Sequence, residues 1–236
     1  MQFEKNRGNS CSFKLTITMQ TDLFDLIVNN DLEGIKAALS ANPELANQGV
    51  ALNIDGKINS RKGHPLHRIC DAVFAHKISD LQAIEIAKIL LEHGANIDGF
   101  MAHGDNNTPL IAAASLHAEQ LGLFYMERGA NIFYAPASDG ATALHWAAYC
   151  GRDKLVEKLI ERGANINQLD TAYHSTPCGW AIHVLESGET GNLHHQPACI
   201  KLLLKAGTDK SLLYSGSIEY LHDAAKTDQA LKTLLE

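Results

Sequence analysis

The hydrophobic positions of the chain recur in short amphipathic segments that predict helices in pairs. The segment "RDKLVEKLIERG" at residues 152–163 places Leu155, Val156, Leu159 and Ile160 along one stripe at helical spacing. Its last residue, Gly163, suits the left-handed backbone that ends many helices. A shorter apolar segment, "TALHWAA", precedes it and begins with threonine, a residue favoured at helix N-caps. The pattern therefore predicts one short helix followed by one amphipathic helix.

The same pair of segments recurs along the chain at a fixed spacing. The first segment starts at Thr108, Thr142 and Thr176, which are 34 residues apart, and a further copy, "HPLHRIC", starts at His64. The distance from this start to the terminal glycine is 21 residues in the two middle copies, but 30 and 31 in the outer two. Two landmarks in phase indicate internal repeats, with nine or ten residues inserted into the outer copies. The terminal glycines are Gly94, Gly129, Gly163 and Gly207.

These units resemble ankyrin repeats, whose T-P-L-H-x-A pattern recurs about every 33 residues. The resemblance implies an all-α fold, a solenoid of stacked helix-turn-helix units with short hairpin fingers. It predicts a flexible leader at 1–20 and one repeat domain at 21–236. Within that domain we expect an N-terminal cap repeat at 21–50, full repeats at 60–97, 104–132, 138–166 and 172–210, and a C-terminal cap at 217–236.

The repeat landmarks are expected to have structural roles. The resemblance implies that the histidine of the motif hydrogen-bonds the backbone between adjacent loops. Trp146 and Trp180 are 34 residues apart and predict an aromatic ladder along the stack, with a ligand-stacking surface as the alternative. Four positions depart from the motif: His64, Ile111, Ala143 and Gly179. The residues assigned structural roles are His67, Thr108, Pro109, Thr142, His145, Trp146, Thr176, Pro177, Trp180, Gly94, Gly129, Gly163 and Gly207.

The insertions and one long connection have patterns of their own. In 71–82, Ser79 and Gln82 form a capping box, so the second helix is expected to start near Ser79 after a lengthened turn. In 187–197, Gly and Ser are expected to end the first helix and Pro197 to begin the second. The stretch 49–63 alternates around Asp55-Gly56 and predicts an extended hairpin finger.

Composition excludes several classes of function. The 236 residues carry a formal net charge of −7 with scattered Lys and Arg, so nucleic acid is not an expected partner. No run approaches the roughly 20 apolar residues of a membrane-spanning helix, and the N-terminus lacks the apolar region of a signal peptide. The five cysteines form no C-x-x-C motif, which favours a reduced cytoplasmic location and no disulfide framework.

Candidate chemistry is weak in this sequence. His64, His67 and Cys70 lie at the spacing of a zinc site, but the repeat register already accounts for His67 and Cys70. His194 and His195, with Cys199 nearby, are a second, solvated candidate. Cys150 is expected to be exposed beside Tyr149 without a strongly basic neighbour. No phosphate loop or hydrolase motif occurs, so we expect no enzyme activity, no metal and no cofactor.

Recognition of another protein remains as the predicted function. The resemblance implies that a partner lies against the fingers and the first helices. We expect a monomeric, non-enzymatic binding module. The alternatives are a dedicated regulatory subunit that inhibits or matures one enzyme through the insertions and, third, a His/Cys metal-binding protein. The residues expected to contact the partner are Arg61, Asp71, Asp105, Asn107, Leu116, Ser138, Asp139, Tyr149, Tyr173 and His183.

Overall fold

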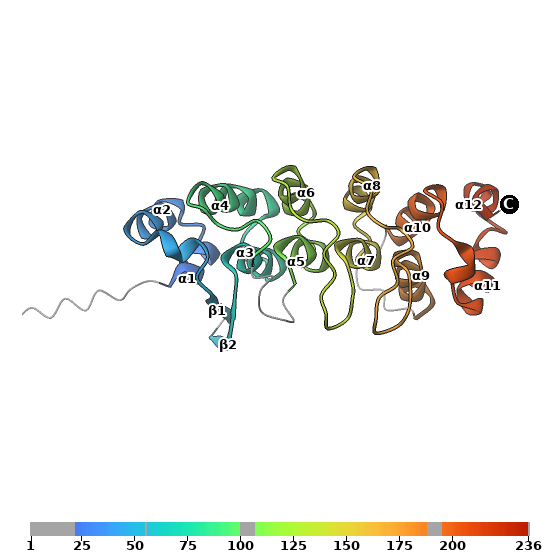
Figure 1. The fold of residues 1–236 in the computed structure, drawn as a ribbon, viewed down its shortest axis with the longest axis horizontal. Coiled ribbons are helices and arrows are strands. Elements are labelled where there is room, and N and C mark those ends of the chain that lie inside the picture. The colour runs from blue at the N-terminus through green and yellow to red at the C-terminus, as the bar shows by residue number, and fades with distance from the viewer. Residues whose placement is uncertain (1–21, 55, 100–106, 188–194, 236) are drawn as a thin grey trace, which may run out of the picture.

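The helices lie in two rows that run the length of the molecule (Figure 1). The computed structural model describes residues 22–54, 56–99, 107–187 and 195–235. One row holds the first helix of each pair: α1 (Leu23–Val28), α3 (Pro65–Phe74), α5 (Pro109–Ser115), α7 (Ala143–Tyr149), α9 (Pro177–Ser187) and α11 (Ser215–Ala224). The other row holds the second helices: α2 (Leu32–Ala41), α4 (Asp80–Glu92), α6 (Glu119–Glu127), α8 (Asp153–Glu161), α10 (Gln196–Lys205) and α12 (Gln229–Leu235).

The connections between successive pairs extend below the first row (Figure 1). The first of them is an antiparallel hairpin of β1 (Val50–Ile54) and β2 (Lys57–Gly63), which confirms the extended finger predicted around Gly56. Two short 3-10 helices, η1 (Pro43–Ala46) and η2 (Lys210–Leu212), complete the described elements. The predicted all-α fold of stacked helix-turn-helix units is confirmed, because helices dominate the described chain.

Caps and glycines define the ends of these helices. The Thr108 and Thr176 hydroxyls accept the N–H groups of Ile111 at 3.3 Å and Gly179 at 3.1 Å. The terminal glycines have φ values between 84° and 99°, the left-handed backbone that glycine adopts without steric cost. They are Gly94, Gly129, Gly163 and Gly207.

The first insertion is distributed differently from the expectation. Helix α4 begins at Asp80 with Ser79 as N-cap, and the Ser79 and Gln82 capping box is present, as predicted. Most of the extra residues, however, extend the two helices, because α3 has ten residues where α5 has seven and α4 has thirteen where α6 has nine. The prediction that they mainly lengthen the turn is wrong. In the second insertion α9 ends at Ser187 and α10 begins at Gln196, and 188–194 lies outside the described residues.

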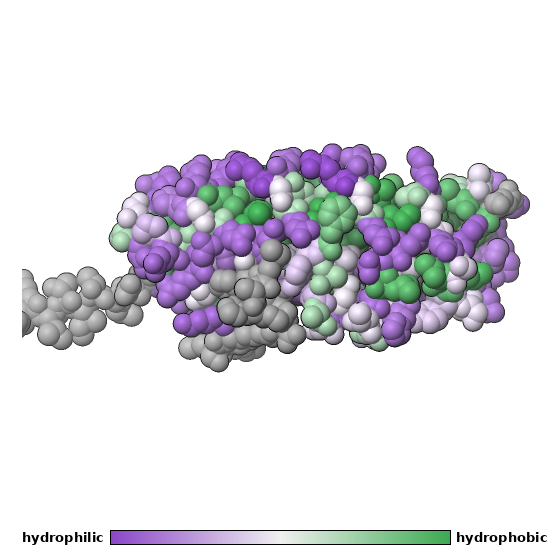
Figure 2. Space-filling model, viewed as in Figure 1, coloured by the Kyte–Doolittle hydropathy of each residue, from purple (hydrophilic) through white to green (hydrophobic). Residues whose placement is uncertain are grey.

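The core lies between the two rows. Small side chains such as Ala113, Ala147 and Ala181 let the first helices pack closely. Tyr125 on α6 is fully buried and its hydroxyl donates to the carbonyl of Leu66 at 2.8 Å, which ties one repeat to the preceding one. The edge formed by the second helices is mostly hydrophilic (Figure 2). No helix in the described ranges is both long and apolar enough to cross a membrane.

Carboxylates at the start of one second helix cap the next one. Asp80 on α4 accepts the N–H groups of Gln120 at 2.7 Å and Leu121 at 2.9 Å, at the start of α6. Glu119 on α6 accepts those of Lys154 at 3.2 Å and Leu155 at 3.3 Å, at the start of α8. Neither α6 nor α8 has a side-chain cap from its own N-cap residue. These interactions supply the missing acceptors from the preceding repeat.

His64 occupies the position that threonine takes in the other repeats. Its Nδ1 accepts the N–H of Leu66 at 3.2 Å, and its Nε2 lies 3.1 Å from Oδ1 of Asn47. Burial, with a smaller contribution from nearby His67, lowers the pKa of His64 to about 4. The neutral imidazole therefore serves as the N-cap of α3.

Candidate partner-binding surface

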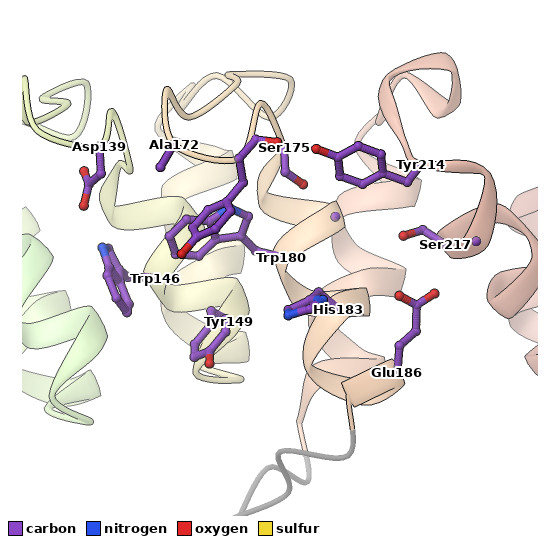
Figure 3. A pocket seen from close by; sticks show the side chains of 13 residues that line it. Asp139, Trp146, Tyr149, Ala172, Ser175, Trp180, His183, Glu186, Tyr214 and Ser217 are labelled. Atoms are coloured by element: carbon purple, nitrogen blue, oxygen red, sulfur yellow. Dashed lines mark hydrogen bonds between the residues drawn. The ribbon is translucent and has the colours of Figure 1, made fainter.

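A hollow of about 690 Å³ lies between the last two fingers and the ends of α7, α9 and α11. Asp139 and Trp146 stand at one end of it, and Glu186 and Ser217 stand at the other, with Trp180 between them (Figure 3). We call this site the aromatic hollow. Its lining residues are Asp139, Trp146, Tyr149, Ala172, Tyr173, Ser175, Gly179, Trp180, His183, Glu186, Tyr214, Gly216 and Ser217.

The aromatic side chains of the hollow contact one another edge to face. The ring of Trp180 lies 5.2 Å from Trp146, 5.8 Å from Tyr149 and 6.0 Å from Tyr173, between ring centroids, with interplanar angles of 74° to 81°. Trp146 and Tyr149 meet at 5.9 Å. Such pairs stabilise packing beyond the area they bury. The two tryptophans contact each other between adjacent repeats and also line the hollow.

Asp170 holds the finger that forms one wall of the hollow. Its Oδ1 accepts the N–H groups of Ala172 and Tyr173 at 2.9 and 2.6 Å. Its Oδ2 accepts the N–H of Ser175 and the indole N–H of Trp180, both at 3.0 Å. Burial raises the pKa of this carboxyl, but the hydrogen bonds prevail and the net pKa lies below its usual value. One buried carboxylate thus fixes both the finger and the central tryptophan.

Hydrogen bonds from the repeats on both sides hold this finger in place. His145 Nε2 lies 3.2 Å from the carbonyl of Ser175, and Thr171 N–H donates to the carbonyl of Asp139 at 2.7 Å. The Tyr214 hydroxyl donates to the carbonyl of Tyr173. The finger backbone that forms this wall of the hollow is therefore held in place by hydrogen bonds.

A missing side chain at Gly179 shapes the wall beneath the finger. A Cβ at this position would lie 2.3 Å from Oγ of Ser175, so any larger residue would displace that side chain. The motif expects histidine here, and the neighbouring repeat has His145 at the equivalent place. Glycine at this position thus leaves the space to the side chain of Ser175.

The structure brings together some of the residues predicted to contact a partner. Asp139, Tyr149, Tyr173 and His183 all line the aromatic hollow. Asn107, Leu116 and Ser138 lie outside its lining, and Leu116 packs against the core. Asp105 and the side chain of Arg61 lie outside the described part of the structure.

Asp71, another residue predicted to contact the partner, forms an ion pair inside the protein instead. Its carboxylate pairs with the guanidinium of Arg68 at 2.5 Å, and both side chains are largely buried. Arg68 also donates to the carbonyl of Val50 at 3.0 Å, so the pair joins α3 to the hairpin. This position supports the first finger, and we do not assign it to a partner contact.

Several residues of the site were not predicted from the sequence. Asp170, Glu186, Tyr214, Gly216 and Ser217 fall outside the repeat motif. Asp170 could have been found from its position, because an acidic residue just before a finger tip can accept nearby backbone N–H groups. Tyr214 could not be identified because α11 begins at Ser215, two residues before the predicted C-terminal cap, and Tyr214 is its N-cap residue.

The described cysteines are buried thiols. Burial raises the pKa of Cys150 to about 11 and that of Cys178 to about 12. The expectation that Cys150 is exposed is wrong, since the residue is buried and its thiol donates to the carbonyl of Ser115 at 3.6 Å. Protonated, buried thiols are poor nucleophiles.

The histidines give no cluster suited to a metal among the described residues. His64 caps a helix, and the Cys70 thiol donates to the Leu66 carbonyl at 3.5 Å. His195 lies 3.4 Å from Asp153, while His194 falls outside the described ranges.

Chelation should therefore leave the fold unchanged. We expect untagged protein treated with EDTA to melt at the same temperature as untreated protein, because His64 and Cys70 already hydrogen-bond within the protein. Thermal unfolding followed by circular dichroism checks this. A large drop in melting temperature on chelation, reversed by added zinc, would contradict it.

Comparison with known proteins gives a family match over the middle of the chain. Residues 74–170 match the model for ankyrin repeats in three copies. Mouse palmitoyltransferase ZDHHC13 is 32% identical over 151 residues, which is 55% of this chain and 22% of that protein. The ankyrin repeat domain-containing protein SAT10 of Stachybotrys chartarum is 27% identical over 184 residues, covering 76% of this chain and 8% of that protein.

A further relative is mouse ankyrin repeat and SOCS box protein 6, 29% identical over 151 residues, with 64% of this chain and 34% of that protein covered. The chain thus spans about a third or less of the length of these three relatives. The shared part corresponds to stacked helix pairs of the kind described above. The chain therefore carries ankyrin repeats over residues 74–170, and its relatives include proteins named for such repeats.

Proposed function

We propose that the chain is a non-enzymatic binding module that holds a partner protein against its fingers and first helices. The aromatic hollow is the observation that supports this proposal. Tyr173 and Tyr214 are 67% and 57% exposed although both are large and amphipathic. Tyrosine and tryptophan are enriched among the residues that dominate binding energy at protein interfaces. Ankyrin repeats mediate protein interactions, and the family match therefore supports this function.

The chemistry of the remaining residues agrees with a module that does not catalyse a reaction. The described cysteines are buried, and the histidines with lowered pKa values serve as helix caps or contacts between repeats. A reduced state of these thiols fits the cytoplasm, where we place the chain, and we propose that it acts as a monomer.

The regulatory-subunit alternative is favoured by a second exposed apolar area in the first insertion. Phe74 is 53% exposed at the end of α3 and contacts His117 edge to face at 5.8 Å, and Leu81 is 69% exposed on α4. Both residues belong to the insertion that distinguishes this repeat from its neighbours. In this alternative the insertion contacts an enzyme and changes its activity.

The binding surface can be tested by single substitutions in the hollow. Tyr173→Ala and Tyr149→Ala should each weaken partner binding by about 1 to 3 kcal/mol, a tenfold or larger loss at the upper part of this range, because each removes a ring from the hollow. Tyr173 is the cleaner site because its side chain is mostly exposed, so the melting temperature should barely change. The measurement is capture from an extract of the native cells, followed by titration calorimetry with the purified partner.

Lys158→Ala on α8 is the matched control. Its ammonium pairs with Glu161 at 2.8 Å on the exposed face of the second row, and such surface pairs contribute little to stability. Its affinity for the partner should equal that of the unmodified protein. Equal affinities for all the variants would instead place recognition elsewhere, and a loss confined to Phe74→Ala or Leu81→Ala would favour the regulatory alternative.

A further inference from the structure

The charged residues in the described lining of the aromatic hollow are of one sign. Asp139 and Glu186 stand at its two ends, and none of the described lining residues is Lys or Arg. Asp139 uses Oδ1 to accept the N–H of Ala141 at 2.9 Å, which leaves its second carboxylate oxygen able to accept further hydrogen bonds. Glu186 is exposed at the end of α9. The hollow thus combines aromatic faces with carboxylates, the two groups that attract organic cations.

The arrangement of the rings distinguishes between kinds of cation. Trp146, Tyr149, Tyr173 and Trp180 touch one another edge to face at 5.2 to 6.0 Å. They form one continuous wall, whereas a box that encloses a methylated ammonium needs rings set apart around a central space. A flat guanidinium can stack on such a wall and at the same time donate two N–H groups to a carboxylate at its edge.

The hollow has room for a long side chain. Gly216 contributes no side chain to the lining, and a Cβ there would meet no heavy atom within 4 Å. The volume of about 690 Å³ exceeds that of a single side chain, so backbone on either side of it can also enter. The wall can therefore cover the aliphatic stem of the cationic residue as well as its head group.

We propose that the aromatic hollow receives an arginine side chain from an extended segment of the partner protein. The guanidinium stacks against Trp146 and donates to Asp139, which stands beside that ring (Figure 3). This inference rests on the proposed function, because it names the chemistry of the partner at that surface. It requires no movement of the finger, which Asp170 already holds in place.

The two tryptophans of the chain provide the measurement. Both Trp146 and Trp180 line the hollow, so intrinsic tryptophan fluorescence reports on this site alone. The probes are acetylated and amidated Gly-Ser-Arg-Ser-Gly and the same peptide with citrulline, lysine or trimethyllysine in place of arginine, at matched ionic strength. Citrulline keeps the shape of arginine without its charge. We expect saturable quenching by the arginine peptide, with a dissociation constant on the order of 1 mM, and the weakest response to citrulline.

Asp139→Asn tests the contribution of the carboxylate. The asparagine oxygen can still accept the N–H of Ala141, so the finger keeps its shape while the charge is lost. We expect roughly fivefold weaker binding of the arginine peptide. Glu127→Gln, an exposed carboxylate at the end of α6, should leave the affinity unchanged.

The outcomes separate this inference from the proposed function. Equal responses to arginine and citrulline, no saturable response, or tighter binding of lysine or trimethyllysine would overturn the assignment of arginine. If partner capture still depends on Tyr173 in that case, the proposed function stands. If capture is insensitive to Tyr173 and Tyr149, the proposed function fails whatever the peptides show.

Discussion

Replacing Asp170 by alanine should lower the free energy of unfolding by about 3 to 4 kcal/mol. The substitution removes the acceptor of four N–H groups, and those of Ser175 and Trp180 are buried where water cannot replace it. Asp170→Asn keeps one acceptor oxygen and should cost about half as much. Urea unfolding followed by circular dichroism gives the free energies, and a red shift of tryptophan emission reports the loosening of Trp180.

Asp98→Ala is a matched control for this result. Asp98 lies in an earlier finger, is partly exposed and, among the described residues, accepts one N–H, that of Asn131 at 2.8 Å. Its loss should cost about 1 kcal/mol or less. If Asp170→Ala were no more destabilising than Asp98→Ala, the buried carboxylate would not be what holds the finger.

Acidification from pH 7 to pH 4.5 should destabilise the protein through His64 by roughly 2 to 3 kcal/mol. Its pKa is lowered to about 4 in the folded state, against 6.5 in the unfolded chain, so the unfolded state binds the proton first. The stabilisation that depends on neutral His64 is fully present above pH 6.5 and is lost as the pH falls toward 4. The free energy of unfolding, measured by urea titration at a series of pH values, checks the slope.

His64→Asn separates this residue from other titrating groups. Asparagine is a favourable N-cap that does not titrate, so the variant should keep the helix start while showing a shallower pH dependence. The dependence should not vanish, because burial also lowers the pKa values of His117 and His145. An unchanged slope in His64→Asn would refute the interpretation. The lowered pKa of Asp170 affects the free energy of unfolding in a separate pH range, below about 3.8.

The repeating landmarks explain why the fold could be predicted. Thr108 and Gly129 keep the same distance as Thr142 and Gly163, and each has a local backbone role that does not depend on distant residues. The capping box of Ser79 and the turn at Gly56 are likewise local, and both are present. The lengths of α3 and α4 could not be predicted, since an insertion between two landmarks can extend helices or the turn with the same sequence spacing.

The candidate site was predicted only in part, for a physical reason. Tyr149 and Tyr173 could be placed because the first stands at the end of a first helix and the second in the finger of the next repeat. Tyr214 and Glu186 enter the hollow through the C-terminal cap and a lengthened α9, which do not follow the motif. Cys150 was misplaced because a helix end that faces a neighbouring repeat is buried by that repeat. Such contacts depend on three-dimensional neighbours that spacing does not specify.

The carboxylates that cap the second helices give the stack a direction. Asp80 and Glu119 each belong to one repeat but accept hydrogen bonds from the helix that follows in the next. Removal of a repeat from either side exposes the apolar interface between repeats. Removal from the amino-terminal side also takes away an acceptor on which the neighbour depends, whereas removal from the carboxyl-terminal side frees a carboxylate that water can solvate. The two ends of the array are therefore not equivalent. At the α4–α6 and α6–α8 boundaries, opening that starts at the amino-terminal end therefore also removes a cap of the next repeat, whereas opening from the carboxyl-terminal end removes none.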